Sequence, residues 1–278
     1  MASNKGIVFV IAVIVIANSI VWFSVARSVG LYDTSSLFFL DVGQGDASLL
    51  TLPGNVQILI DGGPRNGLAL RRIQEILPQG DRYIDMVMMS HPQADHFGGF
   101  LDVVSEYDVG AFVGNGIPGE SNIYHELVSA LHDKKIPYIQ INTGDAIRYK
   151  NYDFAILNPV QGFFPKDPND ASVVTRFSDG NGLGVLFTGD ISIAMEQKLI
   201  ARGTGLVSDI LKVPHHGSKF SSGNAFLKAV SPRLAVVSVG KNNYGHPTKE
   251  ALDRINVFAE NIVRTDINGT IKIRIHND

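Results

Sequence analysis

The 278-residue chain contains no cysteine. Disulfide bonds, thiolate zinc sites, a cysteine nucleophile and lipid attachment at a cysteine are therefore excluded. The chain also lacks an excess of basic charge, because 24 lysine and arginine residues face 27 aspartate and glutamate residues. This balance gives no electrostatic case for a general nucleic-acid-binding surface, although it leaves room for a local one. Eight histidines are present, and five of them fall in short motifs punctuated by glycine or proline: His91, His96, His215, His216 and His246.

A long apolar run lies near the N-terminus, where residues 7–26 contain no charged side chain. At ~1.5 Å of rise per residue, about 20 helical residues span a hydrocarbon core of ~30 Å. We predict that residues 1–27 form an uncleaved signal anchor that crosses the cell membrane once. Residues 28–36 would be a linker, and the domain after it would lie outside the cell. The alternative is a cleaved signal peptide ending near Ser24-Val25-Ala26, which would release a secreted domain.

Residues 37–278 alternate strand and helix patterns and are expected to form one domain. Strands are expected at residues 37–42, 47–52, 56–60, 84–90, near 111, 138–141, 154–157, 172–177, 184–187, 210–213, 234–239, 262–265 and 270–275. Helices are expected at residues 66–77, 97–105, 122–134, 192–201, 225–230 and 248–256. We expect the last two strands to form a hairpin over Asn268-Gly269. The alternation predicts two sheets packed face to face with helices outside.

Side chains that bind divalent cations recur where apolar strands end. They are Asp61, the segment His91 to His96 with Asp95 inside it, Asp190, and the pair His215-His216. Taken alone, an aspartate at a strand end is more often a turn or helix cap than a ligand. Taken together, these residues are typical of a dinuclear hydrolase, in which one cleft collects oxygen and nitrogen ligands from across the fold. A pattern H-x-H-x-D-H would have histidine at position 93, where this chain has Gln93.

This ordered set of motifs resembles the metallo-β-lactamase superfamily and, more narrowly, the extracellular domain of the ComEC family of DNA-uptake proteins. The resemblance rests on residues 39–47, 59–63, 90–99, 169–174, 186–190, 212–218 and 245–248. It implies a four-layer αβ/βα sandwich with the metal ions at one edge of the two sheets. The family's many-helix channel has no counterpart in this sequence. A free-standing, membrane-tethered relative is therefore expected, with a DNA-uptake channel as a candidate partner.

The resemblance also implies roles for individual residues. His91 would belong to a first metal site, and Asp95 with His96 to a second. Asp190 would bridge both metals, and His215 or His216 would complete the second site. Asp61 would orient a histidine ligand and fix its tautomer.

Further positions have two interpretations each. Gln93, Asn169 and Asp170 are candidates for a metal or a substrate, because other branches of the superfamily have histidines there. His246 would bind phosphate or donate a proton, or it would be a hydrogen-bonded histidine in a turn. The side chains near the histidine pair would hold flanking phosphates or would be ordinary surface; they are Lys212, Ser218 and Lys219.

An amide at position 93 is a poorer zinc ligand than imidazole. We therefore predict one or two divalent ions, zinc or manganese, in a tight second site and a weak, oxygen-rich first site. The leading hypothesis is a metal-dependent phosphodiesterase or nuclease that acts on DNA outside the cell, with a single strand as the favoured substrate. Its catalytic residues would be Asp95, Asp190 and His246. The alternatives are a lactone or amide hydrolase of the same superfamily, and a catalytically silent surface domain that binds DNA.

Overall fold

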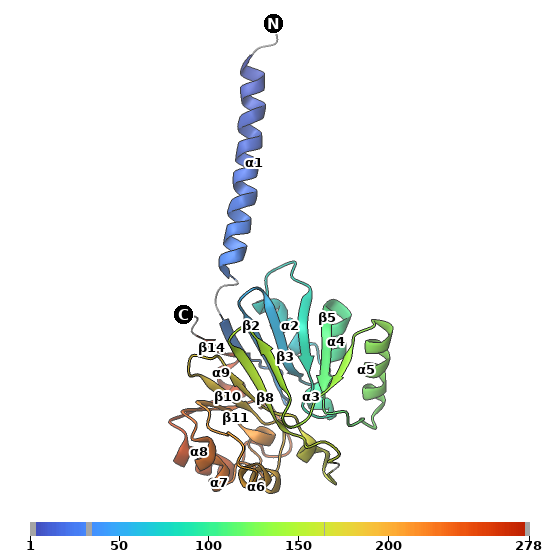
Figure 1. Ribbon diagram of the computed structural model, residues 1–278, viewed down its shortest axis with the longest axis vertical. Coiled ribbons are helices and arrows are strands. Elements are labelled where there is room, and N and C mark those ends of the chain that lie inside the picture. The colour runs from blue at the N-terminus through green and yellow to red at the C-terminus, as the bar shows by residue number, and fades with distance from the viewer. Residues whose placement is uncertain (1–3, 32–34, 164, 276–278) are drawn as a thin grey trace.

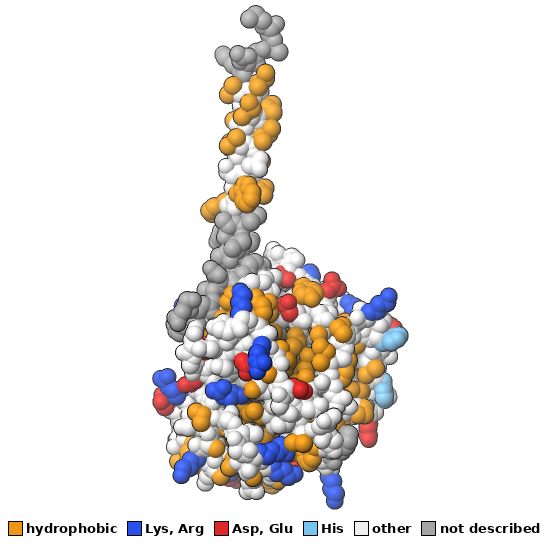
Figure 2. All heavy atoms as spheres, viewed as in Figure 1, with side chains coloured by type: hydrophobic (Ala, Val, Ile, Leu, Met, Phe, Trp, Pro, Cys, Tyr) orange, Lys and Arg blue, Asp and Glu red, His pale blue; other side chains and the backbone are white. Residues whose placement is uncertain are grey.

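The computed structural model describes residues 4–31, 35–163 and 165–275, which form a long N-terminal helix and a layered domain (Figure 1). Helix α1 spans Asn4–Leu31. Its segment Gly6–Phe23 has a mean hydropathy of 2.6 and is not buried. Apolar side chains lie along this helix in Figure 2. By length and composition α1 can serve as a membrane anchor, and a signal sequence would have the same properties.

The structure shortens the predicted linker at both ends. Helix α1 continues to Leu31 rather than ending at residue 27, and the first strand begins at Ser35. The predicted linker at residues 28–36 is therefore helix at its start and strand at its end. Residues 32–34 between them lie outside the described part of the chain.

Two seven-stranded sheets form the middle of the domain within the described residues. The first sheet has the order β14-β1-β2-β3-β4-β5-β6. Its strands are β1 (Ser35–Phe39), β2 (Ala47–Leu52), β3 (Val56–Gly62), β4 (Tyr83–Met88), β5 (Asp108–Gly114), β6 (Tyr138–Gln140) and β14 (Ile271–Ile275). From β14 to β3 neighbouring strands are antiparallel, and from β3 to β6 they are parallel.

The second sheet repeats this division into an antiparallel and a parallel half. Its order is β13-β12-β11-β10-β9-β8-β7. Its strands are β7 (Ala146–Tyr149), β8 (Tyr152–Asn158), β9 (Val174–Ser178), β10 (Gly184–Phe187), β11 (Ile210–Lys212), β12 (Leu234–Val237) and β13 (Asn261–Arg264). Strands β7 to β10 are antiparallel, and strands β10 to β13 are parallel.

Helices cover the outer face of each sheet, as the elements in Figure 1 show. The first sheet is covered by α2 (Leu68–Ile76), α3 (Ala94–Phe97), α4 (Phe100–Glu106) and α5 (Asn122–Asp133). The second is covered by α6 (Ile193–Ala201), α7 (Asn224–Val230) and α8 (Lys249–Phe258). Shorter helical turns are η1 (Pro168–Ala171), η2 (Pro214–Gly217) and α9 (Thr265–Asn268).

Three apolar cores separate the layers. Leu37 and Phe39 of β1 pack between the sheets with Phe154 and Phe177 of the second sheet. Phe38, which points to the opposite face of β1, packs instead beneath the helices of the first sheet. Because strands alternate their side chains between two faces, burial on both faces fits a sheet enclosed on both sides. The predicted four-layer αβ/βα sandwich is confirmed.

The predicted C-terminal hairpin is wrong. Strand β13 pairs in parallel with β12 in the second sheet, whereas β14 pairs antiparallel with β1 in the first. The Asn268-Gly269 dipeptide closes the turn α9 rather than a hairpin, since the Gly269 amide donates to the Thr265 carbonyl over 3.0 Å. Strand β7 was not predicted, and it extends the antiparallel half of the second sheet by one strand.

Candidate metal centre

The candidate ligands lie where strands of both sheets end. Asp61 belongs to β3, and His91 follows the neighbouring parallel strand β4. Asp190 follows β10, and His216 lies in η2, directly after the parallel strand β11. Parallel neighbours end at the same edge of a sheet. The four strand ends therefore deliver these side chains to one place between the two sheets.

A close backbone contact fixes the helical turn that carries His96. The amide of Gly99 donates to the carbonyl of Gly63 over 2.8 Å, and a Cβ atom at Gly99 would lie 2.0 Å from the carbonyl oxygen of Gly62. Only glycine allows this approach, because any other side chain would push the turn off the end of β3. His96 is thereby held over the end of β3, beside Asp61.

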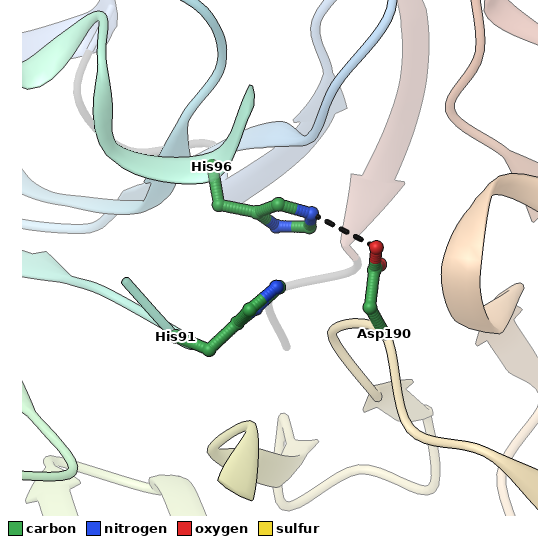
Figure 3. Close-up of side chains that lie close together, drawn as sticks. All are labelled: His91, His96 and Asp190. Atoms are coloured by element: carbon green, nitrogen blue, oxygen red, sulfur yellow. Dashed lines mark ion pairs between the residues drawn. The ribbon is translucent and has the colours of Figure 1, made fainter. Parts of the chain in front are cut away.

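Three side chains at the centre point toward one another (Figure 3). The Nε2 atom of His96 lies 3.3 Å from Oδ2 of Asp190, and the rings of His91 and His96 have centroids 4.2 Å apart. His216 adds its Nε2 atom at 3.5 Å from the same Asp190 oxygen and 3.4 Å from Oδ2 of Asp95. Asp190 is therefore the carboxylate that all three imidazoles face.

Two further groups include Asp46, and the donor atoms of the five residues above form two overlapping groups, in each of which the atoms lie within 4.8 Å of one another. We call them the His91 group (His91, His96 and Asp190) and the His216 group (Asp95, His96 and His216). The Nε2 atoms of all three histidines and Oδ1 of Asp190 are buried without a hydrogen-bond partner in the described part of the chain. Buried polar atoms are normally paired, and here they converge. Imidazole and carboxylate donors at this spacing fit divalent cations.

The opposite ring nitrogens are held by the protein. Nδ1 of His96 lies 3.0 Å from Oδ2 of Asp61, and Nδ1 of His216 donates to the Ser238 carbonyl over 2.8 Å. Nδ1 of His91 lies 3.0 Å from the Ser90 hydroxyl. A partner on Nδ1 turns Nε2 toward the centre as an acceptor, which a metal ligand requires. Asp61 lies where the orienting role that the resemblance implies would place it.

Asp46 is a further carboxylate of the centre, and it was not among the residues predicted to belong to the site. It is 4% exposed, and its Oδ1 lies 3.3 Å from Nδ1 of His216. Its Oδ2 lies 3.7 Å from Nδ1 of His96 and forms an ion pair with Lys212. The only signal was its place directly before β2, at the end of the run Asp41-Val-Gly-Gln-Gly-Asp46.

Two residues expected to face a substrate are buried. Lys212 is 2% exposed and its ammonium group contacts Asp46, and Ser218 is 1% exposed. Neither can hold a phosphate at the surface, so that interpretation is corrected for both. Lys219 alone of the three is exposed, and its Nζ lies 5.1 Å from the centre of the Phe220 ring.

The surrounding charges shift the pKa values of the histidines in opposite directions. Burial would lower the pKa of His216, but Asp190 and Asp46 outweigh burial and raise it to about 10. The pKa of His96 is likewise raised well above its usual value against burial, by Asp190, Asp61 and Asp46. Burial and the neighbouring His96 lower the pKa of His91 to about 3. The carboxylates thus attract positive charge to this place, as a cation site would.

The turn η2 separates the two adjacent histidines. His215 and His216 both have φ of 52°, a left-handed conformation that is unusual for side chains other than glycine. His216 is buried within its group, whereas the side chain of His215 is 30% exposed and its Nε2 lies 3.9 Å from Oδ2 of Asp190. The sequence left open which histidine would be the ligand, and the geometry favours His216.

A cleft of about 620 Å³ opens above the centre. Its lining is Gln44, Pro64, Arg65, Gln93, Ala94, Asp95, Ile123, Asn169, Asp190, His215, His216, Tyr244 and His246. The rings of His246 and His215 have centroids 5.5 Å apart, and Tyr244 lies beside His246 at 5.9 Å. Burial and the neighbouring His215 lower the pKa of His246. A substrate in this cleft would therefore meet Asp95, Asp190 and His246 together.

Gln93, Asn169 and Asp170 were predicted to stand where relatives have histidines. Gln93 and Asn169 line the cleft. The side-chain amide of Gln93 donates to Oδ1 of Asn169. Asp170 does not line the cleft, since its carboxylate accepts from the amide of Ser192 over 3.0 Å at the start of α6. The structure therefore assigns Asp170 to the anchoring of α6 and leaves Gln93 and Asn169 beside the His91 group.

Comparisons with known proteins agree with this fold. The family model of the metallo-beta-lactamase superfamily matches residues 40–241. The chain therefore belongs to the metallo-beta-lactamase superfamily. The chain is also similar to YhfI from Bacillus subtilis, a protein of metallo-beta-lactamase fold, with a TM-score of 0.57, 10% identity, and coverage of 86% of this chain and 99% of that one. That likeness concerns the fold alone.

Within the superfamily, the relatives are competence proteins of the ComEC type. ComE operon protein 3 of Bacillus subtilis is 28% identical over 86% of this chain and 33% of its own length. Competence protein ComA of Neisseria gonorrhoeae is 32% identical over 84% of this chain and 31% of its own. The chain thus spans about a third of the length of these curated relatives.

Proposed function

We propose that this chain is a metal-dependent phosphodiesterase that cleaves DNA outside the cell, with single-stranded DNA as its substrate. The observation that supports this most strongly is that three buried imidazole Nε2 atoms, which make no hydrogen bond with the described residues, converge on Asp190 at the floor of a cleft. The superfamily is generally hydrolytic, and the competence relatives connect the chain with DNA uptake.

Two unequal cation sites would serve this activity. The His216 group would hold the tighter ion, because Asp95, His96 and His216 offer two nitrogens and an oxygen beside Asp190. The His91 group would hold the weaker ion, because Gln93 and Asn169 stand beside it as amides bonded to each other. Amide oxygens suit manganese or magnesium better than zinc.

A divalent cation bound here would supply a polarised water molecule and positive charge for the phosphoryl oxygens. The protein contributes the remaining functions. The side chain of Asp95 is 31% exposed to the cleft and can accept a proton there. Asp190 holds both groups together from below. His246, whose Nδ1 atom makes no hydrogen bond with the described residues, can exchange a proton with the departing oxygen from the cleft wall.

The cleft also offers groups that suit a single strand of nucleic acid. Tyr244 is 75% exposed at the cleft and can stack against an unpaired base. Arg65 lines the same cleft, where its guanidinium pairs with Glu126, and Lys219 is exposed on the loop after η2. A few cationic side chains and one aromatic ring would bind a single strand locally, on a protein whose net charge is −3.

We further propose that α1 anchors the domain to the membrane with the domain outside, and that a DNA-uptake channel delivers the strand. The apolar Gly6–Phe23 segment supports the anchor, and the competence relatives support the partner. A catalytically silent DNA-binding domain is the second candidate. The hydrogen bond between Gln93 and Asn169 favours it, because these amides take the place of two further ligands.

A cleavage assay on the full chain in detergent tests the enzyme proposal. Single-stranded DNA, double-stranded DNA and bis-p-nitrophenyl phosphate are offered with Mn²⁺, Mg²⁺, Zn²⁺ or Co²⁺, and nitrocefin and an acyl lactone serve as the other substrate class. We expect cleavage of the phosphodiesters alone, and a loss of at least about 1,000-fold together with metal binding in Asp190→Asn. DNA binding without cleavage under every metal would support the silent domain instead.

Titration of metal-free protein tests the unequal sites. We expect two well-separated affinities, of which the tighter disappears with the His216 group. Two equally tight zinc ions would contradict this part of the proposal.

A further inference from the structure

A lysine lies inside the metal centre, where a positive charge is unexpected in a cation site. Lys212 is the last residue of β11, its side chain is 3% exposed, and its Nζ forms an ion pair with Asp46. The Nζ atom makes no hydrogen bond of normal geometry with the described residues. Lysine is almost never fully buried unless it is paired with a charge. The role of Lys212 therefore depends on its partner, Asp46.

The carboxylates around Lys212 would repel one another without it. Asp46, Asp61 and Asp190 are each at most 4% exposed. Asp46 and Asp61 both face Nδ1 of His96, and Asp190 faces its Nε2. Uncompensated buried charges cost several kcal/mol each. Asp46 lies between two cationic side chains, since its Oδ2 pairs with Lys212 and its Oδ1 lies 3.3 Å from Nδ1 of His216.

Lys212 does not reach the cleft. Lys212 and Asp46 instead line a separate interior cavity of about 10 Å³, together with Asp61, Ser90 and Thr188. That volume holds about one water molecule. The lysine thus acts on Asp46, and Asp46 acts on the Nδ1 side of His216 and His96.

We propose that Lys212 is a built-in cation of the metal centre, which balances Asp46 in the metal-free protein and keeps the ligand histidines in place before a metal ion binds. Lys212 is then a positioning residue and never touches the substrate. This inference rests on the metal-binding part of the proposed function. Its distinctive consequence is a link between Lys212 and the metal, because a bound dication would compensate the same carboxylates once the lysine is removed.

The melting temperature of the full chain in detergent, without metal and with saturating Mn²⁺, measures this link. The variants are Lys212→Met, Asp46→Asn, the double variant Asp46→Asn/Lys212→Met, and Lys228→Met as a matched control, since Lys228 is an exposed lysine of α7. We expect Lys212→Met to lower the metal-free Tm by about 10 °C. Mn²⁺ should then raise its Tm by more than it raises the Tm of the unaltered chain. The double variant should recover at least half of the loss, because it leaves no charge unpaired.

Each outcome separates this inference from the proposed metal centre. If Mn²⁺ and Zn²⁺ leave the Tm of the unaltered chain unchanged, the metal centre itself fails. Two other results would overturn only the role of Lys212, provided that Mn²⁺ raises the Tm of the unaltered chain. In the first, the metal-free Tm of Lys212→Met equals that of Lys228→Met. In the second, Mn²⁺ raises the Tm of Lys212→Met by no more than it raises the Tm of the unaltered chain. If Lys212→Met does not fold, the double variant decides: a folded double variant supports the inference, and an unfolded one overturns it.

Discussion

The two groups of donor atoms at the metal centre are built differently. In the His216 group, two imidazoles and the Asp95 carboxylate face one another, and Asp46 and Ser238 hold the outer side of His216. In the His91 group, His91 shares His96 and Asp190 with the other group, and the partners of its Nδ1 atom among the described residues are the hydroxyl groups of Ser90 and Ser172. A charged partner strengthens a histidine ligand more than a hydroxyl does. The two groups should therefore bind metal with different strength.

Removing one histidine from each group should give the largest difference in Mn²⁺ affinity between two variants. In His216→Ala, the tighter Mn²⁺ site should weaken by more than about 100-fold, because loss of an outer partner alone costs 10–100-fold. In His91→Ala, the tighter site should keep its affinity within about threefold, and the weaker site should disappear. Calorimetric titration of metal-free protein measures both, and circular dichroism checks the fold. An equal loss in the two variants would mean that the groups form a single site.

Introducing an imidazole at position 93, near His91, should reduce the difference in metal affinity between the two groups. In Gln93→His we expect the weaker site to bind Zn²⁺ about 10-fold more tightly, because imidazole is the better zinc ligand. Gln93→Ala is the control, since it also breaks the bond to Asn169 but adds no ligand. Zinc titration of both variants is the measurement. If neither variant differs from the unaltered chain, the His91 group does not bind metal near position 93.

The smallest expected effect on metal affinity comes from Glu196, which supports the loop after His216. Its carboxylate accepts from the amides of Ser222 and Gly223 over 2.5 and 2.8 Å. Burial raises the pKa of Glu196 from 4.5 to about 7, against the lowering effect of these two hydrogen bonds. The folded state therefore binds an extra proton between these pH values.

The free energy of unfolding should consequently fall as pH rises from about 4.5 through 7, by at most roughly 3 kcal/mol from this group. In Glu196→Gln that contribution should be absent, while Mn²⁺ affinity stays within about twofold. Urea unfolding of both proteins at pH 5 and pH 8 measures the difference between them. The same pH dependence in both proteins would show that Glu196 does not titrate in this range.

The parts of the fold that depend on local sequence patterns could be predicted from the sequence. Strand and helix periodicity predicted both sheets and their covering helices, because each strand had to be apolar enough to be enclosed. The C-terminal hairpin failed because Asn268-Gly269 is compatible with both a hairpin and the end of a helical turn. The choice between them depends on the free edges beside β12 and β1, which belong to different sheets and leave no trace in the local sequence.

The main metal ligands could be predicted from the sequence, whereas the pairing of the buried charges around them could not. His91, Asp95, His96 and Asp190 follow apolar strands and were found together. Asp46 was missed because its partners, His216 and Lys212, lie more than 160 positions away in the chain. Lys212 was placed at the surface because lysine is usually exposed, and only the three-dimensional neighbourhood shows that its charge is paired inside.

The direction of β1 has a consequence for where the enzyme works. Strand β1 begins at Ser35, four residues after the end of α1 at Leu31, and runs antiparallel to β2, which runs antiparallel to β3. β1 and β3 thus point the same way, and Asp61 lies at the far end of β3. At ~3.3 Å per residue, seven residues of strand carry the cleft about 20 Å beyond the point of attachment. On the proposed membrane anchor, the cleft would therefore lie at the end of the domain away from the lipid.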